Sequence, residues 1–353
     1  NCVFFEFKRK MEQNRISVDG CVKGTPVPRF CTFEDDDVPR GVHQCLKYKC
    51  PPSVSEIPKS ARSGMSYCHI SGAETTCTEQ LLLRRKMMGP CWLTIANAKP
   101  STSPFSWCKM EFHTEGVKNI AVAEEHRNTP PPKLKVMGLS IKTVFNEQKR
   151  QNEIVMVGTT AVDGVLADAA TPDWEKRTDS RVLLRAPQHR ALPLDLRETV
   201  REKKMPIDVQ PSERALLNCF FARIHRFDPD VVVAHNIMAF DLEILLSRGS
   251  ENKCANWDRL GRLRRRNHPP KVRAGSNGAN LAKYAAGRLL CDTYLSAKDL
   301  VRQTTYTLAE LCKVQLGVTR DIVESEDIPK HFSDTRNLLG LAHHTAKDTR
   351  LVL

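Results

Sequence analysis

An uninterrupted run of three valines near the middle of the chain most constrains the fold. Val231 to Val233 are β-branched and apolar, with no polar residue between them. Such a run is expected of a strand that is covered on both faces, since a strand with one solvated face alternates apolar and polar residues. A helix that Pro211 opens is predicted before it, and a helix from Phe240 to Arg248, ended by Gly249, after it. The pattern therefore favours an α/β layered domain.

The proline run Asn128 to Pro132 (NTPPP) is a plausible domain boundary, because consecutive prolines prefer extended geometry. After it the pattern becomes regular, and helices are predicted where Thr307 begins a capping box and from Thr335 onward. The other predicted strands are Leu134–Val144, Glu153–Thr160, Arg181–Arg185 and Leu289–Thr293. We predict two domains, residues 1–129 and 130–353, which fits a chain too long for one ordinary core.

Residues 1–129 are irregular in pattern and rich in Pro and Cys. Strand-like runs recur at Cys2–Phe7, Gln44–Tyr48 and Trp92–Ala96, and one helix is predicted at Thr78–Met88. We therefore expect a mixed, strand-rich domain. The first residues lack an initiator Met and the layout of a signal peptide, so the sequence looks like an excised fragment of a longer protein.

The net charge of +13 calls for an explanation, and a polyanion such as nucleic acid is the default partner of so basic a chain. A solubilising surface is the alternative. Much of the excess is local, because the basic segment, defined here as Arg259–Arg273, contains no acid. Its cations are Arg259, Arg262, Arg264, Arg265, Arg266, Lys271 and Arg273. Phosphate contact and a solvated loop or localisation signal explain it about equally, since no aromatic residues interleave for base stacking.

The chain has thirteen cysteines but no CxxC pair, and zinc sites need closely spaced pairs of ligands. Scattered thiols pack as small hydrophobes, so a reducing compartment is the economical inference. No apolar run approaches the ~20 residues of a membrane helix, and we expect no membrane association.

The segment Asp228 to Arg248 is the most informative for chemistry. An apolar strand runs into His235-Asn-Ile237, and Asp241 then stands in the first turn of a helix. Open α/β sheets build their sites at this carboxyl edge. The competing interpretation is an ordinary helix-start acid favoured by the helix dipole.

This segment resembles the second exonuclease motif of family B DNA polymerases, an Asn-x-x-x-Phe-Asp pattern after an apolar strand. Further motifs, in order, make the chain similar to eukaryotic replicative polymerases of the alpha type over most of residues 45–353. They are Gly89-Pro-Cys-Trp-Leu93, Ser106-Trp-Cys-Lys109, Asn152-Glu-Ile154, Gly261-Arg-Leu263, Cys291-Asp292, Ser296-Ala-Lys298 and the run His344–Asp348. The resemblance implies an RNase H-like 3′–5′ exonuclease-type domain beside an amino-terminal domain.

Active relatives hold two metal ions with four carboxylates. The resemblance aligns the first two with Ser140 and Lys142, which are not acids, and the other two with Asp241 and Asp348. His344 replaces the tyrosine that orients water, and neighbouring His343 points elsewhere on a helix. We therefore expect no catalytic residue and no metal here. Lys142 is expected to pair with Asp241 or Asp348 instead.

The same resemblance implies a parent polymerase of the nucleus that binds primer–template nucleic acid and extends primers made by primase, together with accessory subunits. Its polymerase site would use Mg²⁺, but the acidic palm motifs are not found before Leu353, so we expect this region not to polymerise. The favoured interpretation is a non-catalytic scaffold that faces nucleic acid. Its rivals are a metal-dependent 3′–5′ exonuclease with residual activity and a protein-interaction platform.

Overall fold

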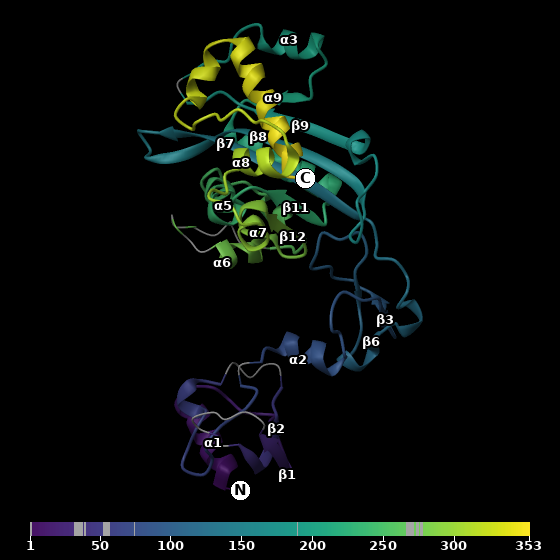
Figure 1. Cartoon of the computed structure of the whole chain (residues 1–353). Coiled ribbons are helices and arrows are strands. Elements are labelled where there is room, and N and C mark those ends of the chain that lie inside the picture. The colour runs from purple at the N-terminus through teal and green to yellow at the C-terminus, as the bar shows by residue number, and fades with distance from the viewer. Residues whose placement is uncertain are drawn as a thin grey trace. The chain divides into compact units, whose positions relative to one another are not determined.

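The computed structural model describes residues 2–31, 38, 40–51, 57–73, 75–188, 190–265, 272, 275 and 278–353. The chain divides into two compact units (Figure 1). The first comprises residues 1–99 and 114–128, and the second comprises residues 100–113 and 129–353. The segment 100–113 thus belongs with the regular α/β part of the chain.

The second unit is built on a six-stranded sheet of order β10-β9-β8-β7-β11-β12. The strands are β7 (Leu134–Asn146), β8 (Gln151–Val165), β9 (Thr178–Leu184), β10 (Ile207–Val209), β11 (Val231–Ala234) and β12 (Leu289–Asp292). β7, β8 and β9 pair antiparallel, whereas β10 is parallel to β9 and β11 is parallel to both β7 and β12. The five predicted strands of this region are therefore confirmed, and β10 was not predicted.

Helices cover both faces of this sheet (Figure 1). They are α3 (Leu196–Glu202), α4 (Glu213–Phe227), α5 (Leu242–Glu251), α6 (Gly278–Ala282), α7 (Thr293–Leu300), α8 (Leu308–Leu311) and α9 (Thr335–Leu351). On one face, α4 and α5 pack Phe220 and Leu245 against Ile154 and Val157 of β8. On the other, α3 and α9 pack Leu196 and Leu341 against neighbouring residues of β8 and β9. The predicted α/β layered fold, covered on both faces, is confirmed.

The approach of α9 to the sheet depends on two glycines. A methyl group on Gly138 of β7 would lie 2.1 Å from the carbonyl oxygen of Thr349 in α9. One on Gly158 of β8 would lie 2.8 Å from the Thr345 side chain. The helix backbone therefore lies directly on the strands, where the Thr349 and Thr160 hydroxyls share a 2.6 Å hydrogen bond.

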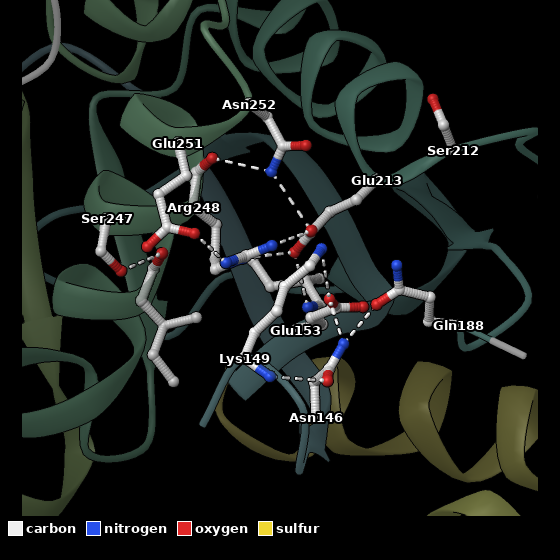
Figure 2. A network of polar contacts seen from close by, with 12 residues as sticks. Asn146, Lys149, Glu153, Gln188, Ser212, Glu213, Ser247, Arg248, Glu251 and Asn252 are labelled. Atoms are coloured by element: carbon white, nitrogen blue, oxygen red, sulfur yellow. Dashed lines mark hydrogen bonds and ion pairs between the residues drawn. The ribbon is translucent and has the colours of Figure 1, made fainter. Parts of the chain in front are cut away.

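A buried ionic network ties α4, α5 and the central hairpin together (Figure 2). Glu213, in the first turn of α4, accepts hydrogen bonds from Arg248 of α5 at 2.9 Å and from the Ile154 amide at 2.8 Å. Arg185 donates to Glu153 at 2.9 Å and to the Ile154 carbonyl at 2.7 Å. Each buried charge has an opposite charge beside it, which burial requires. The network therefore fixes both backbone polar groups of Ile154 at the start of the core part of β8.

In the first unit, β1 (Val22–Cys31) and β2 (Gly41–Lys49) form one antiparallel pair, and β3 (Leu93–Ile95) and β6 (Ile120–Val122) form another. The predicted runs Gln44–Tyr48 and Trp92–Ala96 are confirmed, as is the helix α2 (Cys77–Arg84). The prediction of a strand at Cys2–Phe7 is wrong, because these residues begin helix α1 (Cys2–Gln13). Its buried Phe7 and Met11 are four residues apart, which is a helical spacing. The short run Cys2–Phe7 does not reach Met11 and so does not reveal this spacing.

One predicted helix end is wrong. α5 continues through Gly249 to Glu251, because Gly249 is buried against Phe221 and Trp257 and does not end the helix. The Thr307 side chain caps α8 by accepting from the Glu310 amide, but the helix then widens into a π-helical turn, Cys312–Leu316, before Gly317. Among the described residues, none of the helices combines the length and the apolar character that crossing a membrane requires.

Replacing Gly138 by Ala is expected to lower the free energy of unfolding by about 3 kcal/mol, because the new methyl would overlap the Thr349 carbonyl oxygen. Gly340→Ala, in the open part of the same α9, is expected to raise it by about 1 kcal/mol through helix propensity. Urea denaturation followed by circular dichroism measures both. Equal stabilities of the two variants would contradict the tight packing of α9 on β7.

Candidate functional site

The structure gathers the positions of the predicted degenerate site at one edge of the sheet. Ser140 and Lys142 lie on β7 two residues apart, so their side chains leave the strand on one face. His344 and Asp348 lie four residues apart on α9, which crosses β7 and β8. Asp241 ends the π-helical turn Ile237–Asp241 that follows β11 and leads into α5. Because β7 and β11 are parallel, their carboxyl ends bring Lys142 toward Asp241.

Asp348 is the centre of a buried ion cluster. Its carboxylate, 2% exposed, accepts from Arg320 Nε at 2.7 Å and Nη2 at 3.0 Å, and from Lys142 Nζ at 2.9 Å. Burial alone would raise the pKa of Asp348, but the hydrogen bonds and charges of Arg320 and Lys142 outweigh it and hold that pKa below its usual value. The expected pairing of Lys142 with an acid of the site is thus present, and the acid is Asp348.

Arg320 was not predicted as a site residue. It lies in the loop between α8 and the 3-10 turn Ile328–Ser333, where no periodic pattern marks a position. The guanidinium meets Asp348 through two nitrogens, the geometry that suits a carboxylate best. Only the tertiary structure brings this loop to α9.

His344 adds no positive charge at neutral pH. Its Nε2 lies 2.7 Å from the Asp321 carbonyl oxygen, which can only accept, so this nitrogen carries the proton. Nδ1 faces the Asp348 carboxylate at 3.5 Å and makes no hydrogen bond within the described part of the chain. Burial lowers the pKa of His344 and keeps the ring neutral.

Asp241 is also buried, at 8% exposure. Burial raises its pKa to about 7, against the attraction of Lys142, and the negative charge of Asp292 adds to the rise. Asp292 ends β12 and accepts from the Asn236 amide at 2.9 Å and the Met238 amide at 3.0 Å. These bonds hold the loop in which Asn236 has a left-handed backbone, and so determine where the following turn places Asp241.

The side chains present do not match the set that holds two divalent cations. Of the four positions that the resemblance assigns, two carry carboxylates, and the oxygens of one of them, Asp348, already bind Arg320 and Lys142. Divalent cations need several anionic oxygens in place of water. Among the residues described, no three His, Cys, Asp or Glu side chains are grouped closely enough to hold a metal ion. Ser140 is partly buried on β7 and adds a neutral hydroxyl.

The described part of the basic segment lies against the segment 100–113. Trp107 donates from its backbone to the Arg262 carbonyl at 2.7 Å and from its ring nitrogen to Asp258 at 3.2 Å. The guanidinium carbons of Arg259 and Arg264 lie 5.1 and 4.6 Å from the centre of its ring. The structure thus supplies an aromatic ring from a distant part of the sequence, and two arginines already stack on it.

Other cations of the basic segment have partners inside the fold. Arg262 pairs with Asp228 at 3.0 Å and with Asp230 at 2.7 Å, and Arg265 lies 5.0 Å from the centre of the Tyr284 ring. Arg266, Lys271 and Arg273 lie outside the described residues. Phosphate contact by this segment stays a prediction, with Arg264 the exposed member among the described arginines.

The pKa of Asp241 is raised and that of Asp348 is lowered, so the stability of the fold depends on pH. Asp241 keeps its proton to about pH 7 in the folded chain but loses it near pH 4 when unfolded, so stability falls as pH rises between these values. Asp241→Asn is expected to remove this loss and to raise the free energy of unfolding at pH 8 by roughly 4 kcal/mol, with little change at pH 4. Denaturant titrations across pH measure it.

The exposed Asp299→Asn variant is the control and should follow the wild-type profile. The wild type and both variants keep Asp348, whose effect on stability has the opposite sign. The stabilisation by Asp348 is lost as pH falls through its lowered pKa. An Asp241→Asn profile parallel to that of the wild type would contradict the buried, protonated carboxyl.

Comparison with known proteins shows the family of this chain. The family model described as DNA polymerase family B, exonuclease domain, matches residues 68–311. The chain is similar to the DNA polymerase alpha catalytic subunits of Mus musculus (35% identical over 291 residues), Xenopus laevis (34% over 331) and Arabidopsis thaliana (33% over 335). These matches cover 82%, 94% and 90% of this chain but only 19%, 22% and 22% of the relatives. The chain spans about a fifth of their length, and it belongs to the exonuclease-domain family of the family B DNA polymerases.

Proposed function

We propose that this chain is the amino-terminal and exonuclease-like region of a replicative DNA-directed DNA polymerase of the alpha type. The family match and the printed names of the similar proteins support this, as does the order of the short motifs along the sequence. The parent would work in the nucleus, bind primer–template nucleic acid and extend primers made by primase, with accessory subunits. Mg²⁺ would belong to its polymerase site.

Within that parent, we propose that this region is a scaffold whose proofreading site has been lost. The observation that carries the proposal is that Asp348 forms ion pairs with Arg320 and Lys142. Two fixed cations lie where a carboxylate of an active relative would meet metal, and they neutralise it without metal. Positive charges at this distance repel an incoming divalent cation, and the low dielectric of a buried site strengthens that repulsion.

The remaining acid does not restore a metal site. Burial favours the protonated form of Asp241 near neutral pH, and a protonated carboxyl is a poor ligand for a hard cation. Ser140 offers a hydroxyl in place of a carboxylate. The region keeps the shape of the exonuclease fold while the ion cluster takes over the electrostatic role of the metals.

The wild-type chain is expected to leave a 3′-labelled single-stranded DNA intact in Mg²⁺ or Mn²⁺, at the level of a buffer control, because the site lacks two of four carboxylates. Denaturing gel electrophoresis of the labelled strand measures this. Asp241→Ala is the matched control for contamination. Metal-dependent shortening that Asp241→Ala abolishes would overturn the scaffold proposal in favour of residual exonuclease activity.

Lys142→Glu tests whether the lysine stands in for metal charge. In EDTA the variant is expected to lose about 3 kcal/mol of unfolding free energy, because a second buried carboxylate would face Asp348. Lys142→Met removes the cation without adding a carboxylate and should lose less. Thermal and urea denaturation measure both variants. A Lys142→Glu protein as stable as the wild type in EDTA would contradict the role given to Lys142.

A second function, contact with nucleic-acid phosphates, is favoured by the exposure of Arg264. No ion pair engages its guanidinium within the described part of the chain, whereas Arg262 is held by Asp228 and Asp230. Arg264→Gln is expected to reduce the slope of log affinity against log salt for primer–template DNA by about 1. Fluorescence anisotropy across a salt series measures the slope.

Arg302→Gln removes an exposed arginine outside the basic segment and serves as the control. It should leave the slope unchanged. An affinity without salt dependence would exclude phosphate contacts and would favour the rival interpretation, a platform for acidic partner proteins.

A further inference from the structure

Two cysteines face each other at one end of the β1–β2 pair in the first unit. The strands are antiparallel, with Val22 opposite Lys49 and Lys23 opposite Tyr48. Cys21 and Cys50 directly flank this first pair, so continuing the register by one step would set them opposite each other. Directly opposed residues of an antiparallel pair have α-carbons about 4.5–5.5 Å apart, which is within the range that a disulfide bridges.

The side chains confirm that the two cysteines meet. The Cys50 thiol lies close enough to Cys21 to contribute to the raised pKa of Cys21. Their neighbours also meet, because Gly20 has a left-handed backbone and a methyl group on it would lie 3.4 Å from the Pro51 ring. The backbone segments that carry the two cysteines therefore lie close together.

The two thiols differ in their surroundings. Cys21 is half-buried and packs against the small core that Phe7 and Met11 of α1 form, whereas Cys50 is exposed. Burial, and then the hydrogen bond and charge of Cys50, raise the pKa of Cys21 to about 12. Cys21 therefore keeps its proton near neutral pH and can donate it toward Cys50, the sulfur that a dissolved oxidant reaches.

We propose that Cys21 and Cys50 form a redox-sensitive pair that a peroxide converts to a reversible disulfide. The Cys50 sulfur attacks a peroxide oxygen, the O–O bond breaks, and Cys50 sulfenic acid and water result. The Cys21 sulfur then attacks the Cys50 sulfur, so that the S–S bond forms and the S–O bond breaks. The Cys21 proton leaves with the hydroxide as a second water, and two thiols and one peroxide become one disulfide and two waters.

This site is independent of the proposed function, because the pair lies in the first unit and the exonuclease-like site lies in the second. All thirteen cysteines are free thiols in the structure. Cys31, at the other end of β1, is partly buried like Cys21 but lies opposite Gly41. It therefore provides a matched control without a thiol across the ladder.

The test uses the whole reduced chain, brief exposure to hydrogen peroxide, and peptide mapping by mass spectrometry without reductant. The peptide that joins Cys21 to Cys50, lighter by two hydrogens than the separate peptides, should be at least about tenfold more abundant than any other crosslink, because the two thiols react as a preorganised pair. Dithiothreitol should reverse it. Cys21→Ser and Cys50→Ser should abolish it, and Cys31→Ser should retain it.

Three results would overturn the proposal. One is recovery of Cys21 and Cys50 as uncrosslinked thiols while other cysteines oxidise. Another is oxidation of Cys50 to sulfinic acid without a crosslink to Cys21. The third is a set of crosslinks among many cysteines in similar yield, which would indicate unspecific oxidation.

Discussion

The close approach of α9 to the central hairpin is the constraint on which the second unit depends. Gly138 and Gly158 have no side chain that would push the helix away, so at these two points α9 comes close to β7 and β8. That contact brings Asp348 down to Lys142. A bulkier residue at either glycine would separate the two sides of the site and uncover the core that α9 closes. The packing of α9 on the sheet and the ion pair of Asp348 with Lys142 therefore both depend on these two glycines.

Two buried charge clusters of this unit are balanced by protein groups. Glu213 meets Arg248 on one side of the sheet, and Asp348 meets Arg320 and Lys142 on the other. Removing one member of such a cluster costs more than the cluster contributes, because an unpaired charge stays behind. In an active relative metal ions would belong to the balance. Here Arg320 and Lys142 supply positive charge to Asp348, which supports our proposal that the site is part of the framework.

Much of the basic segment also serves the fold. Arg262 forms ion pairs with Asp228 and Asp230 in the turn just before β11. Arg259 and Arg264 stack on Trp107 from the segment 100–113. A high density of like charges in a sequence therefore overstates the charge that remains free for a ligand. The exposed Arg264 is the described residue at which the two roles can be separated experimentally.

The sequence by itself determined the layered α/β fold, because the apolar run Val231–Val233 and the long predicted strands depend on local periodicity. From the order of the motifs it also assigned the expected site positions, with Ser140 and Lys142 as non-acids, and this assignment stays a prediction. It missed the helix at Cys2–Gln13 and the role of Arg320. Which acid Lys142 meets, and which cation completes the cluster, was decided only by tertiary structure, because these contacts join residues 28 and 206 positions apart. No local pattern encodes a contact over such distances, and only the packing of α9 against the sheet produces it.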